Sequence, residues 1–217
     1  MAVQVENYNK INKELQSAQV TLIAVSKTKS DEDIMTLYDL GHRDFGENYV
    51  QELVEKESSL PKDIRWHFIG HLQSNKVKYL APFVHLIHGV DSEKLVKEID
   101  KQGKKLGKKI GCLLQMHIAQ EETKFGFSEE ELSQLNMSLY ENVTVQGLMG
   151  MASFTKNETL VMQEFKNLHQ VFEKMQAEDD VMQILSMGMS ADYPTAIQQG
   201  SNMVRIGSLL FGERNKQ

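Results

Sequence analysis

The chain has 217 residues, of which 41% are hydrophobic and 25% are charged, and this composition suits one globular domain with a sizeable core. Its formal net charge of −6 argues against a general binder of nucleic acids or membrane surfaces, because such proteins present a basic face to phosphates. The sequence has no leader-like start, no run of about eighteen apolar residues, and a single cysteine, Cys112, in an apolar stretch, so we expect a soluble, cytoplasmic protein without disulfides.

Short apolar runs alternate with amphipathic segments, which is the pattern of strand–helix units that build a parallel sheet. A helix comes first, because Tyr8, Ile11 and Leu15 recur at helical spacing. The expected strands, in chain order, are 22–27, 44–46, 66–70, 86–90, 112–118, 145–151, 183–187 and 203–206. The helices expected between them include 31–40, 48–57, 92–106, 128–140 and 159–175.

Eight strand–helix units that close on themselves form a (β/α)8 barrel, although this chain is shorter than the roughly 250 residues typical of that fold. The alternative is an open, doubly wound sheet, but no Gly-x-Gly-x-x-Gly follows the first strand, as a dinucleotide-binding fold would require. Only three prolines and no linker-like stretch occur. We therefore predict an α/β protein with one TIM-type barrel domain over residues 1–217, an extra N-terminal helix and no second β domain.

Lys27 ends the first expected strand, and barrels of this kind build their sites at the carboxyl ends of the strands. Side chains alternate along a strand, so Ile23, Val25 and Lys27 share one face and give the amine an apolar floor. A partly desolvated amine can lose its proton near neutral pH and attack an aldehyde. Lys27 is therefore a candidate Schiff-base lysine, and the alternative is a solvated lysine at a strand end.

The ends of the second and third strands also carry polar residues. Asn48, followed by Gln51, fits a helix N-cap with a partner three residues on, and capping is the first interpretation. The alternative is an amide that faces a ligand ring at the barrel mouth. His67 and His71 share a strand parity, but a metal pair needs a third ligand and supporting groups, so we predict no metal site and assign both to wall and loop packing.

The last two strands carry the strongest local features. Ser186 and Ser190 lie where a strand leads through a Ser/Gly turn into a helix with Pro194 in its first turn. Gly207 and Ser208 follow the eighth strand and supply further backbone and hydroxyl donors. The turns after strands seven and eight often hold a phosphate in this fold, although a plain turn or cap is the alternative for any one serine. Neither turn is a Walker-type loop, so nucleoside triphosphate binding is not indicated.

Arg205 lies inside the eighth strand, where a permanent charge is unusual in an apolar run. One interpretation is structural pairing with a carboxylate, and the other is contact with a ring nitrogen. An amine, a phosphate cradle and a cation between them match pyridoxal 5'-phosphate held as a lysine aldimine. A guanidinium donor keeps the pyridine nitrogen unprotonated and limits carbanion stabilisation, so such a site favours holding and exchanging the aldehyde.

Four segments of the chain, in order, resemble the pyridoxal phosphate homeostasis protein family. They are 22–29, 45–52, 66–76, and the block that joins 185–190 to 204–207 and 211–212. By that resemblance Lys27 is the Schiff-base lysine, Arg205 faces the pyridine nitrogen and Asn48 approaches the ring. The residues that the resemblance places around the phosphate are Ser186, Ser190, Gly207 and Ser208.

The family has the barrel of alanine racemase but lacks the second, all-β domain, which brings one of the two acid/base groups that a racemase needs. The resemblance thus implies a cytoplasmic vitamin B6 carrier and buffer, with no catalytic residue, that exchanges its cofactor with free amino acids or apo-enzymes. A barrel this compact and acidic is expected to be a monomer. The alternatives are a pyridoxal phosphate-dependent amino-acid racemase of narrow scope and a barrel aldolase that uses Lys27 on a sugar phosphate. The chain departs from the family pattern in a shorter start and in His117, where the family commonly has an asparagine. It also has Asn202 where a threonine is frequent, and this asparagine is expected to alter the donors near the phosphate.

Overall fold

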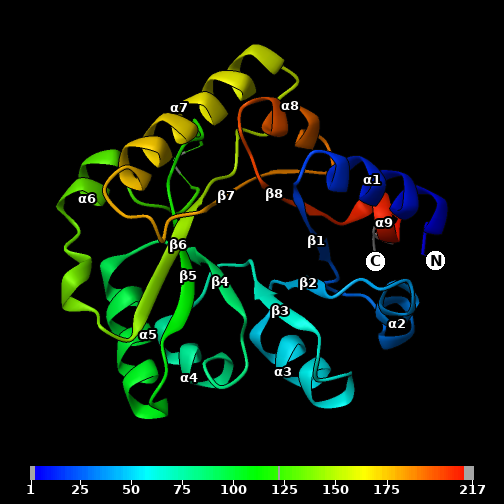
Figure 1. The fold of residues 1–217 in the computed structure, drawn as a ribbon, viewed down its shortest axis with the longest axis horizontal. Coiled ribbons are helices and arrows are strands. Elements are labelled where there is room, and N and C mark those ends of the chain that lie inside the picture. Colours follow the sequence, from blue (N-terminus) through cyan, green and yellow to red (C-terminus); the bar gives the residue numbers. More distant parts are fainter. Residues whose placement is uncertain (1–2, 122, 213–217) are drawn as a thin grey trace.

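A computed structural model describes residues 3–121 and 123–212. Within these residues, eight parallel strands pair in chain order and close into a barrel, because β8 pairs with β1 (Figure 1). The strands are β1 (Thr21–Val25), β2 (Asp44–Glu47), β3 (Arg65–Phe68), β4 (Leu86–Val90), β5 (Ile110–Gln115), β6 (Val143–Met149), β7 (Ile184–Met189) and β8 (Met203–Ile206). The predicted (β/α)8 barrel is confirmed.

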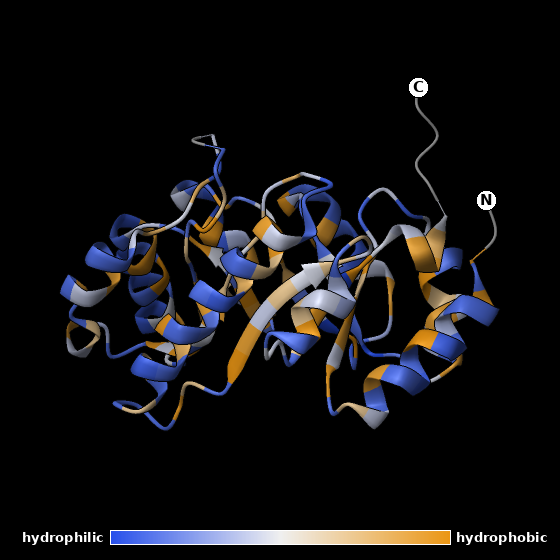
Figure 2. Cartoon of the chain, turned by 90° about the horizontal axis from the view of Figure 1, so that it is seen from above, coloured by the Kyte–Doolittle hydropathy of each residue, from blue (hydrophilic) through white to orange (hydrophobic). Residues whose placement is uncertain are grey.

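Helices surround the barrel and cover the outer faces of its strands (Figure 1). They are α1 (Val5–Ser17), α2 (Asp31–Asp39), α3 (Val50–Ser59), α4 (Val77–Leu80), α5 (Glu93–Leu106), α6 (Glu129–Gln134), α7 (Glu158–Gln176), α8 (Tyr193–Gln198) and α9 (Ser208–Phe211), with 3-10 turns η1 (Ser74–Lys76) and η2 (Met137–Leu139). Hydrophilic and hydrophobic residues alternate along these helices, as expected of amphipathic helices that pack on a sheet (Figure 2). Among the described helices, none has the length and apolar content needed to span a membrane.

The extra N-terminal helix is confirmed as α1, which buries Tyr8, Ile11 and Leu15 as predicted. It packs beside α9, so the two ends of the described chain lie together (Figure 1). The backbone N–H of Gln4 donates to the carbonyl of Leu210 across 2.7 Å. The N-terminal segment therefore supports the turn after β8, where one part of the predicted site lies.

One predicted helix is wrong in its extent. The segment 128–140 contains only the short α6 and then η2. Ser128 begins α6 with a capping box, in which its hydroxyl accepts from the N–H of Glu131 and the Glu131 carboxylate accepts from Ser128. Leu135 is extended, and the Asn136 side chain accepts from the N–H of Ser138, which starts a new turn. A second local cap thus competes with continuation of the helix.

The barrel interior is filled by side chains rather than open. Its apolar layer consists of Ile23, Leu86, Leu113, Met149 and Met203, which are all nearly inaccessible to solvent. Residues of the opposite parity, such as Ala24 and Cys112, belong to the larger core between the strands and the helices, so the predicted burial of the thiol is confirmed. The side chain of Ile23 points into the barrel, and the sequence predicts that Lys27 lies on the same face as Ile23.

Candidate functional site

The sequence predicts that the first strand ends at Lys27, but β1 ends at Val25, so Lys27 lies in the turn that follows, half-buried at the carboxyl end of the barrel. Both of its neighbours are tied to the β2–α3 unit. The Ser26 hydroxyl donates to Oε1 of Glu47 across 2.6 Å, and the N–H of Thr28 donates to Oε1 of Glu52 across 2.5 Å. Thr28 adopts a φ of +62°, in the left-handed region that a threonine rarely takes. The backbone on each side of Lys27 is therefore fixed.

A buried lysine links these anchors behind the barrel wall. The ammonium group of Lys56 lies 2.9 Å from Oε1 of Glu47, 2.7 Å from Oε1 of Glu52 and 2.9 Å from the carbonyl of Ser26. Burial raises the pKa of Glu47, and the charge of Lys56 opposes that rise. Sequence reasoning missed this cluster, although Glu47 and Lys56 lie nine residues apart on either side of the turn that follows β2.

Asn48 is not the cap of α3, so the first interpretation of this residue is wrong. The helix begins at Val50, and Tyr49 is its N-cap residue, without a side-chain hydrogen bond. The turn after β2 is one residue longer than expected, which leaves Asn48 outside the helix. Its Oδ1 is buried without a hydrogen-bond partner, and Asn48 borders a pocket of about 600 Å³ between α3 and α4. A buried acceptor without a partner requires a ligand or a water to satisfy it.

The ends of β1, β7 and β8 meet at the same mouth. The N–H of Gly207 donates to the hydroxyl of Ser190 across 3.3 Å. A Cβ placed on Gly207 would lie 3.3 Å from the Cβ of Val25, two residues before Lys27. Ser208 is the first residue of α9 and continues this group. The structure thus brings Ser190, Gly207 and Ser208 to the end of the barrel that carries Lys27.

Arg205 lies within β8, deeper in the barrel than these donors, and is only 4% exposed. Its NH1 donates to the carbonyl and the hydroxyl of Ser186 across 2.8 and 2.7 Å, and its NH2 donates to the carbonyl of Gly150 across 3.0 Å. No carboxylate forms an ion pair with Arg205 in the described part of the chain, so the carboxylate-pairing interpretation is wrong there. Burial lowers the pKa of Arg205 to about 10, against the charge of Asp192, and the guanidinium stays charged at neutral pH.

Ser186 does not lie with the other predicted phosphate donors. It is fully buried in the middle of β7, in register with Met203, two residues before Arg205 on β8. Its hydroxyl accepts from Arg205 and lies 3.3 Å from Nδ1 of His88. The expected strand ended at 187 whereas β7 runs to Met189, so the turn begins later than the sequence suggested.

The two histidines of the third segment lie apart. His67 points into the barrel, where its Nε2 is 3.1 Å from Oδ1 of Asp44. His71 is exposed, contacts Asp91 across 2.7 Å, and stacks on Phe125 with ring centroids 4.0 Å apart. His67 thus belongs to the barrel wall and His71 to a loop, as expected. Among residues 3–121 and 123–212, no three or more His, Cys, Asp or Glu side chains are arranged so that they could hold a metal ion.

Asn202, one of the departures from the family pattern, lies away from the mouth. It precedes β8 at the opposite end of the barrel, where its Oδ1 accepts from the N–H of Leu185 across 2.8 Å. Its amide nitrogen donates to the carbonyl of Gln183 across 2.7 Å. The expectation that Asn202 alters the donors near the phosphate is therefore wrong.

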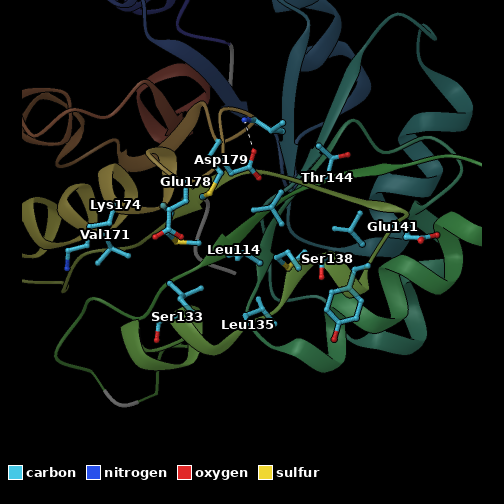
Figure 3. A pocket seen from close by; sticks show the side chains of 18 of the residues that line it. Leu114, Ser133, Leu135, Ser138, Glu141, Thr144, Val171, Lys174, Glu178 and Asp179 are labelled. Atoms are coloured by element: carbon cyan, nitrogen blue, oxygen red, sulfur yellow. Dashed lines mark hydrogen bonds between the residues drawn. The ribbon is translucent and has the colours of Figure 1, made fainter.

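A further pocket, of about 740 Å³, lies on the outside of the barrel between α6, η2 and α7 (Figure 3). It forms because the short α6 leaves the outer face of β5 and β6 partly uncovered, and its walls include Leu114, Leu135 and Val171. The described residues that line it include none of those predicted for the site. This pocket is therefore separate from the barrel mouth.

Residues 4–215 match the protein family described as alanine racemase, N-terminal domain. The chain is similar to the pyridoxal phosphate homeostasis protein of Aquifex aeolicus, with 42% identity over 197 residues that cover 89% of this chain and 86% of that protein. It is also similar to the structure of PipY from Synechococcus elongatus without PLP, with 32% identity, a TM-score of 0.87, and coverage of 95% of this chain and 99% of PipY. A structure of PipY with PLP bound gives the same identity and coverage with a TM-score of 0.85.

Proposed function

This chain belongs to the alanine racemase N-terminal domain family and, within it, to the pyridoxal phosphate homeostasis proteins, and on that premise we propose that it binds pyridoxal 5'-phosphate (PLP) and acts in the homeostasis of this cofactor. Residues 1–217 would serve as one cofactor-binding domain. The relatives and PipY support the cofactor, and the residues at the barrel mouth support its place in this chain.

The anchored Arg205 is the observation that carries the proposal. Three hydrogen bonds fix its NH1 and NH2 groups, and a guanidinium has five N–H donors, so Nε–H and one N–H of NH2 are left for a ligand. A buried cation with unused donors fits an acceptor such as a pyridine nitrogen. The orphaned Oδ1 of Asn48 at the same end of the barrel fits a ring substituent that donates.

The remaining residues fit the other parts of the cofactor. When bound, PLP supplies an aldehyde that condenses with an amine with release of water, and Lys27 is the amine that we propose to hold it. The Ser190 hydroxyl and the N–H of Ser208 would donate to the phosphate, and the N–H of Gly207, which donates to Ser190, would hold that hydroxyl in place beside it. Ser186, in contrast, would not contact the phosphate and would hold Arg205 in place by accepting a hydrogen bond from its NH1 group.

We further propose that the protein is a carrier and buffer rather than an enzyme. A guanidinium at the ring nitrogen keeps that nitrogen unprotonated, which weakens carbanion stabilisation. A racemase needs an acid/base group on each face of the substrate's α-carbon, and we propose that no residue among 3–121 and 123–212 serves as the second such group opposite Lys27. Exchange with free amino acids, supply to apo-enzymes, a monomeric state and a cytoplasmic location remain predictions within this proposal.

Borohydride reduction of the PLP-loaded protein tests the proposal. We expect reduction to attach the cofactor at Lys27, located by peptide mass mapping, and Lys27→Ala to abolish both the attachment and the absorbance band of the bound cofactor. Lys29→Met is the matched control, because Lys29 is two residues away and its amine donates to the carbonyl of Phe211. Attachment at another lysine, or an unmodified Lys27 in cofactor-loaded protein, would contradict the proposal.

Two measurements separate the carrier from the alternatives. Deuterium exchange at the α-carbon of a panel of amino acids, at a rate above that of free PLP, would favour a racemase. A colourless protein that borohydride traps only with a sugar phosphate would favour an aldolase. We expect neither result.

A further inference from the structure

A row of hydrogen-bonded side chains crosses the barrel interior beneath the candidate site. The Ser186 hydroxyl, which accepts from Arg205, lies 3.3 Å from Nδ1 of His88. The Nε2 of His88 lies 3.0 Å from Nδ1 of His67, and Nε2 of His67 lies 3.1 Å from Oδ1 of Asp44. These residues come from β8, β7, β4, β3 and β2, so the row connects five strands. Ser186 and His88 are fully buried, and His67 is 1% exposed.

The direction of each hydrogen bond follows from Asp44. Although burial acts to raise the pKa of Asp44, hydrogen bonds from His67 and Arg65 hold it below its ordinary range, so its carboxyl is ionised and only accepts. Nε2 of His67 therefore carries a hydrogen and donates to Asp44. A neutral imidazole has one N–H, so Nδ1 of His67 accepts and Nε2 of His88 donates. Nδ1 of His88 then accepts from the hydroxyl of Ser186.

The surroundings favour neutral rings in both histidines. Burial lowers the pKa of His67, against the hydrogen bond and charge of Asp44. Burial also lowers the pKa of His88, and the positive charge of Arg205 lowers it further. Arg65, which pairs with Asp44, also faces His67. The ring centroids of His85 and His67 lie 5.2 Å apart. Arg205 lies at one end of the row and Arg65 pairs with Asp44 at the other, so a protonated histidine would add a further cation between two guanidinium groups. Every donor in the row therefore points from Arg205 toward Asp44.

We propose that His88 and His67 are positioning residues that orient Arg205 for the cofactor ring by fixing the direction of the Ser186 hydroxyl. Because the hydroxyl hydrogen points to His88, the oxygen of Ser186 presents its lone pairs to NH1 of Arg205. Without the acceptor on His88, that hydrogen is free to turn toward the guanidinium, and the bond from NH1 is lost. The inference rests on the proposed function only for the contact between Arg205 and the cofactor.

The tautomers can be measured without cofactor. In apo-protein labelled with 15N in histidine, long-range 1H–15N spectra at neutral pH should show His67 and His88 as neutral rings protonated at Nε2. Signals of an Nδ1–H tautomer, or of an imidazolium, at either residue would overturn the assignment. This result does not depend on whether the protein binds PLP, so it separates a failure of the row from a failure of the proposed function.

Two variants of His88 and one control test the positioning role. Gln at position 88 can donate from its amide nitrogen and accept at its oxygen, whereas Leu can do neither. We expect His88→Leu to raise the dissociation constant for PLP roughly tenfold, the size of one lost hydrogen bond to a charged group, and to shift the absorbance of the bound cofactor. His88→Gln should restore both values, and His85→Leu should leave them unchanged, because the His85 ring lies beside the row but outside it.

Thermal unfolding of each apo-protein identifies a merely structural effect. Folded His88→Leu protein that binds PLP with the wild-type dissociation constant and spectrum would overturn the positioning role. An equal loss in His88→Gln and His88→Leu would also overturn it, since only the leucine variant lacks the hydrogen bonds. If His88→Leu does not fold, the tautomer measurement and His88→Gln still decide.

Discussion

The ammonium group of Lys56 lies 2.9 Å from the carboxylate of Glu47, and both side chains are buried behind the wall of the barrel. The same ammonium group contacts the carbonyl of Ser26, the residue before Lys27. The hydrogen bonds of this cluster therefore extend to the backbone that presents the Lys27 amine. The cluster joins β1, β2 and α3 at the end of the barrel where the site lies.

Lys56→Met should destabilise the protein by about 3–5 kcal/mol, because it leaves the carboxylate of Glu47 buried without its cation. Urea unfolding of the apo-protein measures this loss. Lys62→Met is the control, since Lys62 pairs with Glu57 but its side chain is 64% exposed, and its free energy of unfolding should hardly change. Equal losses in the two variants would contradict a buried role for Lys56.

The interior row predicts how stability depends on pH. Burial lowers the pKa of His67 and His88 in the folded protein, so below about 6.5, the ordinary value, the unfolded chain binds more protons than the folded one. The stability that these rings contribute is present above that pH and is lost as the pH falls through it toward the folded values. Urea unfolding across this range should show the loss, and His88→Gln should reduce its slope. A slope unchanged in His88→Gln would be inconsistent with a neutral buried His88.

Asn48→Ala should separate binding from stability. The variant removes a buried acceptor that has no partner, so the apo-protein should unfold at the same denaturant concentration or a higher one. Its dissociation constant for PLP should rise roughly tenfold, the size of one lost hydrogen bond. Ser128→Ala is the control for a true helix cap, because Ser128 caps α6: it should cost about 1 kcal/mol of stability and leave binding unchanged. A loss of stability without a loss of affinity in Asn48→Ala would restore the capping interpretation.

Much of the architecture could be predicted from the sequence, because each strand appears as a short apolar run and each helix as an amphipathic segment. The order of the strands then follows from the short connections between them. The end of α6 could not be predicted, because a competing cap at Asn136 starts a new turn. The length of β7 could not be predicted either, because the strand continues for two residues, to Met189, into a segment with the composition of a turn. The family resemblance is confirmed by the match over residues 4–215 and by the curated relatives.

The site residues at strand ends could be predicted more readily than those inside the barrel. Lys27 and Gly207 follow apolar runs, and a closed barrel brings such ends to one mouth. The contact between His88 and Ser186 depends instead on the stagger of β4 against β7, which no single segment encodes. Sequence parity places both side chains inward but does not say that they share a layer. This is why the row was visible only in the structure.

Arg205→Glu tests the ring contact directly. A carboxylate at the pyridine nitrogen favours the protonated ring, so we expect the absorbance spectrum of bound PLP to change. Arg43→Gln is the control, because Arg43 pairs with Asp63 near the surface. Because a buried carboxylate can prevent folding, circular dichroism should accompany the spectra. An unchanged spectrum in a folded variant that retains its cofactor would remove Arg205 from the ring nitrogen.

Ser186, inside β7, and Ser190, in the turn after it, should respond differently to the phosphate of the ligand. Ser190 bonds Gly207 at the mouth, so Ser190→Ala should weaken PLP roughly tenfold but hardly affect pyridoxal, which lacks the phosphate. Ser186 is fully buried and bonds Arg205, so Ser186→Ala should weaken PLP and pyridoxal by similar factors. Equilibrium titration of each variant with both ligands gives the factor by which the dissociation constant rises for PLP and for pyridoxal. A phosphate-dependent loss in Ser186→Ala would return that serine to the phosphate group, since only a direct contact distinguishes ligands that differ at that end.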